Sequence, residues 1–167
     1  HNVRNALAAS AAAMAVGIDA ASIARGLERF SPVAGRLQRK TAANGALVID
    51  DTYNANPDSV RAAIDVLAAA PAPRTLVLGD MGEVGSEGVA FHEEIGLFTL
   101  GTLARHATRA FGQGAVHFDD MDKLTAEITG VPASASILVK GSRFMQMERV
   151  VNHLTGQPTC LLYTSDA

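Results

Sequence analysis

The chain has 167 residues, 48% of them hydrophobic and 19% charged, so it is long enough to bury the core of one domain of ordinary size. This balance excludes an intrinsically disordered protein. Because only 5% of the residues are aromatic, the core must consist mainly of Ala, Val, Leu and Ile. The formal net charge is −3 and Lys and Arg form no run, which argues against a nucleic-acid or polybasic membrane contact. The longest apolar stretch is too short to span a bilayer, and the single cysteine favours a reducing compartment.

The beginning of the chain predicts two helices. Residues 3–16 are apolar nearly all round, which is typical of a helix buried on every side. Asp19 is suited to cap a second helix, in which apolar residues recur at helical spacing. Residues 31–35 contain proline and glycine and break this pattern. We therefore expect a domain boundary here, with residues 1–34 ending one domain and residues 35–157 forming another.

A β-hairpin follows the boundary. Residues 36–41 and 46–50 are predicted strands, and Asn44-Gly45 between them is a strong turn signal. The segment Asn56-Pro57-Asp58-Ser59 then predicts the start of a helix. Proline is tolerated in the first turn of a helix, and an aspartate is favourable at its positive end.

Strands and helices alternate through the remainder of the chain. We expect strands at residues 75–79, 115–118 and 136–140. We expect helices at residues 88–100 (continuing or restarting through Arg105), 121–128 and 145–154. This alternation predicts an α/β fold with a Rossmann-like, doubly wound and mostly parallel sheet.

Three loops lie where ligands bind in such a sheet, beyond the carboxyl ends of the strands. They are residues 50–56, 79–83 and 140–143. Each loop carries polar residues directly after an apolar strand and leads towards a helix start, where backbone N–H groups favour anions.

The loop of residues 140–143 combines two cations with a glycine. Gly141 allows the backbone to approach a ligand closely. Lys140 and Arg143 are suited to binding carboxylate or phosphate, although a solvated turn with two surface cations explains the pattern as well.

The acidic residues of the other two loops also allow two interpretations. Asp50 and Asp51 are adjacent at a strand end, so only one of them can face the crevice, and a helix-capping turn is the alternative. Asp80 and Glu83 are suited either to binding a cation or an amine or to stabilising their own loop. The histidines show no metal-ligand spacing, so we expect no metal site among them.

Five segments in order along the chain resemble the Mur ligase family, and the match covers about residues 1–156. They are His1-Asn2-Val3-Arg4-Asn5-Ala6-Leu7-Ala8-Ala9, Gly35-Arg36-Leu37-Gln38, Asp50-Asp51-Thr52-Tyr53-Asn54-Ala55-Asn56-Pro57-Asp58-Ser59, Leu78-Gly79-Asp80-Met81-Gly82-Glu83-Val84-Gly85 and Val139-Lys140-Gly141-Ser142-Arg143. The last two segments are most similar to the family members that use D-alanyl-D-alanine.

The resemblance implies an ATP-dependent ligase of peptidoglycan synthesis in the bacterial cytoplasm, acting as a monomer. ATP would phosphorylate the terminal carboxylate of UDP-N-acetylmuramoyl-tripeptide, and the amine of D-alanyl-D-alanine would then attack the acyl phosphate. Two alternatives stay open. The first is a Mur-type ligase for another amino acid, and the second is a non-catalytic α/β module that binds a nucleotide or an anion.

The resemblance also implies roles for individual residues. ATP would be bound by His1, Asn2, Asn5, Arg36 and Asp51. The substrates would be bound by Asn54, Asn56, Asp80, Glu83, Lys140, Ser142 and Arg143. The catalytic residues would be Arg36, Asp51 and Lys140.

In the family, the phosphate loop, the Mg²⁺ ligands and the UDP-sugar domain precede the segment that His1 begins here. We therefore expect this chain to be the carboxy-terminal part of a longer enzyme, with the Mg²⁺ ligands in the preceding part. On its own it is expected not to turn over ATP. Residues 158–167 resemble a translated adaptor and are excluded from the fold prediction.

Overall fold

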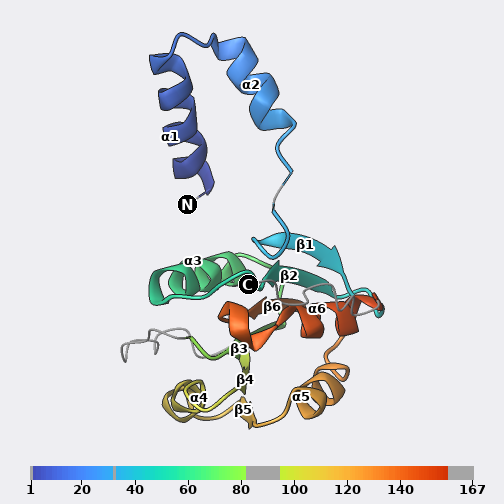
Figure 1. Cartoon of the computed structure of the whole chain (residues 1–167). Helices are drawn as coiled ribbons and strands as arrows, with labels where there is room; N and C mark the ends of the chain where they lie inside the picture. The colour runs from blue at the N-terminus through green and yellow to red at the C-terminus, as the bar shows by residue number, and fades with distance from the viewer. Residues whose placement is uncertain (1, 32, 82–94, 158–167) are drawn as a thin grey trace, which may run out of the picture. The chain divides into compact units, whose positions relative to one another are not determined.

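The computed structural model describes residues 2–31, 33–81 and 95–157, and the chain divides into two compact units, His1–Val33 and Ala34–Ala167 (Figure 1). The first unit contains helices α1 (Asn2–Ala15) and α2 (Ala20–Glu28). As predicted, Asp19 caps α2, and its side chain accepts the N–H of Ser22 at 2.9 Å.

The predicted burial of the first helix is wrong. Val3, Leu7 and Met14 of α1 are all exposed, and α2 has no buried residue. Two short helices do not offer enough surface to enclose a helix that is apolar on every side.

The second unit is built on a six-stranded sheet in the order β1-β2-β6-β3-β4-β5. β1 is antiparallel to β2, and the other neighbouring pairs are parallel. The strands are β1 (Gln38–Thr41), β2 (Leu47–Asp51), β3 (Arg74–Gly79), β4 (Ile95–Leu100), β5 (Ala115–Phe118) and β6 (Ser136–Lys140). The helices are α3 (Pro57–Ala68), α4 (Arg105–Phe111), α5 (Met121–Ile128), α6 (Glu148–Thr155) and a 3₁₀ turn η1 (Arg143–Met145).

The predicted hairpin is confirmed. β1 and β2 pair antiparallel with Gln38 opposite Asp50 and Thr41 opposite Leu47. Gly45 in the turn has φ +96°, a conformation that glycine adopts without a steric penalty.

The sheet is covered on both faces, as a doubly wound fold requires. Figure 1 shows α3 and α4 on one side of the sheet and α5 and α6 on the other. Side chains alternate between the two faces along each strand, so the strands contribute to a hydrophobic core on each face. Val77 packs on the α5–α6 side, whereas Leu76 and Leu78 pack on the α3–α4 side. The predicted α/β class with a mostly parallel sheet is therefore confirmed.

One predicted helix is wrong. Residues 95–100, expected to end a helix over 88–100, form β4, which pairs in parallel with β3 and with β5. A short apolar run has no periodicity that separates a buried strand from a helix, and here hydrogen bonding to two neighbouring strands decides. Residues 88–94 lie outside the described residues, and the helix that follows begins only at Arg105.

Candidate functional site

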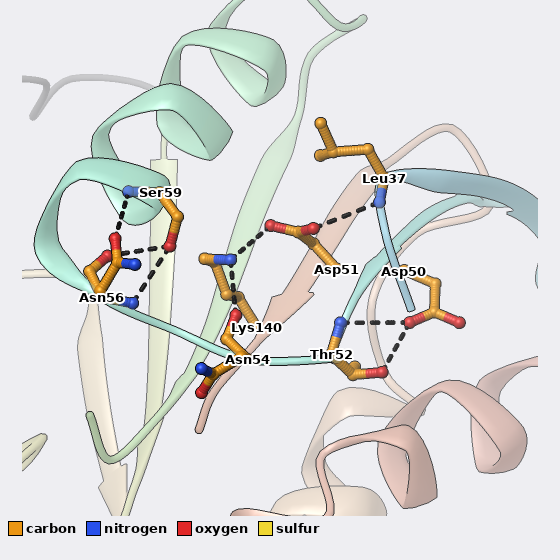
Figure 2. Close-up of polar contacts among 8 residues, drawn as sticks. All are labelled: Leu37, Asp50, Asp51, Thr52, Asn54, Asn56, Ser59 and Lys140. Atoms are coloured by element: carbon orange, nitrogen blue, oxygen red, sulfur yellow. Dashed lines mark hydrogen bonds and ion pairs between the residues drawn. The ribbon is translucent and has the colours of Figure 1, made fainter. Parts of the chain in front are cut away.

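The parallel pairing of β2 with β6 brings Asp51 beside Lys140, because these two residues are opposite each other in the sheet. Lys140 Nζ lies 2.6 Å from Asp51 Oδ2 and 2.9 Å from the carbonyl oxygen of Asn54 (Figure 2). The Lys140 side chain is only 2% exposed, and that of Asp51 is 13% exposed. This ion pair joins the ends of two strands to the loop that follows β2.

The two adjacent aspartates have different partners, as alternation along a strand predicts. Asp50 accepts hydrogen bonds from Lys40 Nζ at 2.7 Å and from the Thr52 hydroxyl at 2.8 Å. The second oxygen of Asp51 accepts the N–H of Leu37 at 3.2 Å (Figure 2). Asp51 therefore connects β6 with the segment that precedes β1.

Two arginines lie over the same aromatic ring, that of Tyr53, near the carboxyl ends of β2 and β6. The guanidinium carbon of Arg36 is 4.2 Å from the centroid of the Tyr53 ring, and that of Arg143 is 5.7 Å from it. All three residues are exposed. Stacking on an aromatic face stabilises a guanidinium while leaving its N–H groups able to bind phosphate or carboxylate.

Gly35 allows the segment before β1 to lie against the loop after β2. Its carbonyl accepts the N–H of Tyr53 at 2.9 Å, and its φ is +71°. A Cβ at this position would lie 2.8 Å from the Tyr53 nitrogen, closer than a carbon and a nitrogen can approach. The position of Arg36 relative to Tyr53 thus depends on the preceding residue being glycine.

The structure gives Asn56 a capping role. Its side chain accepts the N–H of Ser59 at 2.8 Å, and the Ser59 hydroxyl accepts the Asn56 N–H at 3.0 Å, which forms a capping box at the start of α3 (Figure 2). Asn54 contributes its carbonyl to Lys140, and its side chain is exposed. Substrate binding by either asparagine stays a prediction.

Asp80 has an internal partner as well. It is buried, and its Oδ1 accepts the N–H of Ala104 at 2.6 Å, immediately before α4. Its carbonyl accepts the N–H of Ser142 at 3.0 Å, so the loops after β3 and β6 are joined. These contacts match the loop-stabilising alternative for Asp80, and a substrate contact by Asp80 or Ser142 stays a prediction.

The structure does not test the predicted ligand contacts of four further residues. His1 and Glu83 lie outside the described residues, as does the side chain of Asn2. Asn5 lies on α1 in the first unit and is exposed. Nucleotide binding by His1, Asn2 and Asn5 stays a prediction.

Sequence reasoning did not assign a role to Tyr53 or Leu37. Tyr53 had a usable signal, because an aromatic residue inside a polar loop after a strand is unusual in a chain with 5% aromatic residues. Leu37 had none, since a positive φ such as its +49° is not expected of a leucine from sequence.

A second polar cluster lies after the carboxyl end of β5, the strand at the far side of the sheet from β1. Asp119 pairs with Arg105 at 2.5 Å and with His117 Nε2 at 3.1 Å. The Arg105 hydrogen bond, and then that of His117, hold the pKa of Asp119 below its ordinary 3.8. A carboxylate with a lowered pKa stabilises the fold at neutral pH, and this contribution is lost on acidification through its folded-state pKa.

Replacing Arg105 with methionine should therefore raise the pKa of Asp119 towards the ordinary value. The measurement is a carbon-13 NMR titration of the side-chain carboxyl group. Arg109→Met removes a charge from the same helix and should leave the titration of Asp119 nearly unchanged. Equal shifts in the two variants would show that the local hydrogen bond is not the cause.

Neither a metal cluster nor a membrane helix is found in the part of the chain that the structure describes. Over residues 2–31, 33–81 and 95–157, no group of three or more His, Cys, Asp or Glu side chains is placed to hold a metal ion. No helix in those ranges has the length and apolar character needed to cross a membrane. We assign no Mg²⁺ ligand to the described residues.

Comparison with known proteins identifies relatives that match almost the whole chain. The UDP-N-acetylmuramoyl-tripeptide–D-alanyl-D-alanine ligase of Escherichia coli (strain K12) is 39% identical over 96% of this chain. The ligase of the same name from Bacillus subtilis (strain 168) is 35% identical over 95% of this chain. In both cases the chain spans only 38% of the relative's length.

Solved structures give the same result for the fold. MurF from Acinetobacter baumannii superposes with a TM-score of 0.79 at 34% identity, over 94% of this chain and 38% of that one. MurF from Thermotoga maritima, solved in complex with ADP, has a TM-score of 0.68 at 25% identity, over 88% of this chain and 36% of that one. The family model described as "Mur ligase, glutamate ligase domain" matches residues 35–143. Because the matched residues include all six strands of the sheet, the chain belongs to the Mur ligase family.

Proposed function

We propose that this chain is the carboxy-terminal part of an ATP-dependent ligase that joins D-alanyl-D-alanine to UDP-N-acetylmuramoyl-tripeptide in peptidoglycan synthesis in the bacterial cytoplasm. The observation that carries the proposal is that two exposed arginines, Arg36 and Arg143, have their guanidinium carbons over the Tyr53 ring, which follows the carboxyl end of β2. It is supported by the D-alanyl-D-alanine ligases that match 95–96% of the chain.

The reaction explains why such a site is cationic. A carboxylate is a poor acyl donor because its leaving group would be oxide, whereas an acyl phosphate releases a stable phosphate anion. When bound, ATP supplies the phosphoryl group that activates the tripeptide carboxylate. Catalysis then depends on positioning and on stabilising negative charge, which are functions that arginine side chains perform well.

In this proposal, each exposed arginine has a distinct task. Arg36 binds a phosphate oxygen with its planar fork of N–H donors, and stacking on the Tyr53 ring restrains the guanidinium. Arg143 binds the carboxylate of the dipeptide or the acyl phosphate. Asp51 has one oxygen on Lys140 and one on Leu37, so a ribose hydroxyl would approach its partly exposed edge. A substrate contact by Lys140 would have to use its third N–H or displace Asp51.

The proposal can be tested in a chimeric enzyme, because the chain spans 38% of the Escherichia coli relative. This chain replaces the matching region of that ligase, and phosphate release is measured with ATP, UDP-N-acetylmuramoyl-tripeptide and D-alanyl-D-alanine. We expect release only when all three are present. Release that single amino acids support as well as the dipeptide does would favour a Mur-type ligase of different specificity. Nucleotide binding without release from a folded chimera would favour a non-catalytic module.

Arg36→Ala in the chimera should lower kcat/KM for ATP by about a hundredfold, the typical loss when one charge-stabilising donor is removed from an active site. Arg39→Ala is the matched control, since Arg39 is an exposed arginine on the neighbouring strand β1. It should leave kcat/KM nearly unchanged. If both variants lose activity equally, Arg36 has no specific role at the phosphate.

A further inference from the structure

The ammonium group of Lys140 bonds to two acceptors inside the chain. It is bonded to the Asp51 carboxylate at 2.6 Å and to the Asn54 carbonyl at 2.9 Å, with the side chain 2% exposed. A ligand that took the place of Asp51 would have to break a buried ion pair, which is unfavourable, and the enclosed side chain offers its third N–H little access to a ligand. The position of Lys140 is suited to holding neighbouring residues and not to contacting a substrate.

Asp51 transmits this restraint to the backbone beside Arg36. While one oxygen of Asp51 is bonded to Lys140, the other accepts the N–H of Leu37 at 3.2 Å (Figure 2). This N–H belongs to the peptide group that joins Arg36 to Leu37. The orientation of that peptide group is therefore fixed by the ion pair.

The peptide group before Arg36 is held from the same loop. Its carbonyl, that of Gly35, accepts the N–H of Tyr53 at 2.9 Å. Asp51 and Tyr53, two residues apart, thus restrain the backbone on both sides of Arg36. The Tyr53 ring in turn lies under the Arg36 guanidinium, 4.2 Å from its central carbon.

Leu37 needs such a restraint. Its φ of +49° lies in the left-handed region, where a side chain with a Cβ is sterically disfavoured. A hydrogen bond from the Leu37 N–H to a charged acceptor offsets this strain. If the acceptor moves, the backbone at Leu37 gains by relaxing, and Arg36 moves with it.

We propose that Lys140 is a positioning residue that acts through Asp51 on the peptide group between Arg36 and Leu37, and so holds the Arg36 guanidinium over Tyr53. The proposal rests on the proposed function only for what Arg36 binds. It replaces the substrate contact that the sequence predicts for Lys140 with an indirect role.

The test is NMR spectroscopy of the whole chain carrying Lys140→Met. Hydrogen exchange of the Leu37 amide should become roughly tenfold to hundredfold faster, which corresponds to the loss of one hydrogen bond to a charged group. The Arg36 Nε–H resonance should lose the ring-current shift that Tyr53 causes. If both signals match those of the unchanged chain while the sheet is folded, the proposal is wrong.

Lys40→Met is the matched control. Lys40 pairs with Asp50 at 2.7 Å, so this variant also removes a lysine from an aspartate of β2. Asp50 is bonded to Thr52 and not to the Arg36–Leu37 peptide group. The signals of Leu37 and Arg36 should therefore stay in place, and an equal effect of both lysines would overturn the proposal.

A second variant keeps the test decisive if Lys140→Met does not fold. Lys140→Met combined with Asp51→Asn leaves no unpaired buried charge, and such replacements are often tolerated. The Leu37 amide then has at best a neutral acceptor, so its exchange should still be about tenfold faster. Unchanged exchange in this double variant would overturn the proposal.

The chimeric ligase separates this proposal from the proposed function. If Lys140 acts through Arg36, Lys140→Met should lower kcat/KM for ATP by about tenfold and add little to the loss caused by Arg36→Ala. Additive losses would show that Lys140 acts independently of Arg36. The NMR signals need no ligand, so they test the positioning role even if the chimera proves not to be a ligase.

Discussion

Lys140→Met is expected to lower the free energy of unfolding by about 3 kcal/mol. The variant leaves the Asp51 carboxylate without its counter-charge and the Asn54 carbonyl without its donor. Breaking a buried ion pair from one side typically costs about 3–5 kcal/mol. We expect the lower end because Asp51 is 13% exposed and keeps some contact with water. Urea unfolding followed by circular dichroism measures the change.

Two further variants separate the effect of breaking the Lys140–Asp51 ion pair from the effect of losing any lysine. Lys40→Met should cost less, about 2 kcal/mol, because the Lys40 side chain is 27% exposed and Asp50, although only 4% exposed, keeps its bonds to Thr52. Removing both charges, with Lys140→Met and Asp51→Asn together, should recover part of the loss. A double variant as unstable as the sum of its two single variants would contradict a coupled pair.

Gly101→Ala is expected to destabilise the chain by about 3 kcal/mol, from backbone strain and a clash together. Gly101 has φ +105°, and a Cβ there would lie 2.5 Å from Asp80 Oδ1 and 2.6 Å from Oδ2. The carboxylate would have to move, which breaks its 2.6 Å bond to the Ala104 N–H before α4. Thermal unfolding of the purified variant measures the loss.

Gly112→Ala isolates the strain from the clash. Gly112 has φ +81°, and nothing lies within 4 Å of the position that its Cβ would take. Its ψ of −129° lies outside the left-handed helical region, in backbone space that is largely restricted to glycine, so strain alone should cost about 2 kcal/mol. Equal losses at the two glycines would mean that Asp80 accommodates the methyl group.

The fold was largely predictable because the turn residues and the alternating apolar segments in the sequence agree with the observed sheet topology. Asn44-Gly45 set the hairpin turn, and the alternation of strands and helices indicated the parallel sheet. Residues 95–100 were not predictable, because a strand buried between two others has the same continuous apolar composition as a buried helix. The exposure of α1 was missed because composition shows only that a helix is apolar, and not whether there is enough protein to cover it.

The candidate site was predictable at the level of loops, and less so at the level of contacts. The rule for strand ends selects the loops that contain Asp51 and Lys140, and the sheet register places these residues opposite each other. Sequence could not show that Lys140 is buried or that Asp51 bonds to Leu37, because both depend on pairing between strands far apart in the chain. The contacts of Tyr53 with two arginines could not be predicted for the same reason, although its place in a polar loop was a usable signal.

The order of the strands has a consequence for how the chain acquires its fold. β6 lies between β2 and β3, although it is the last strand in the sequence. Until residues 136–140 have been synthesised, both neighbours lack a partner along one edge and expose unpaired backbone groups. The sheet therefore assembles late, through contacts between distant residues, which makes folding intrinsically slow and leaves newly made chains prone to associate with one another.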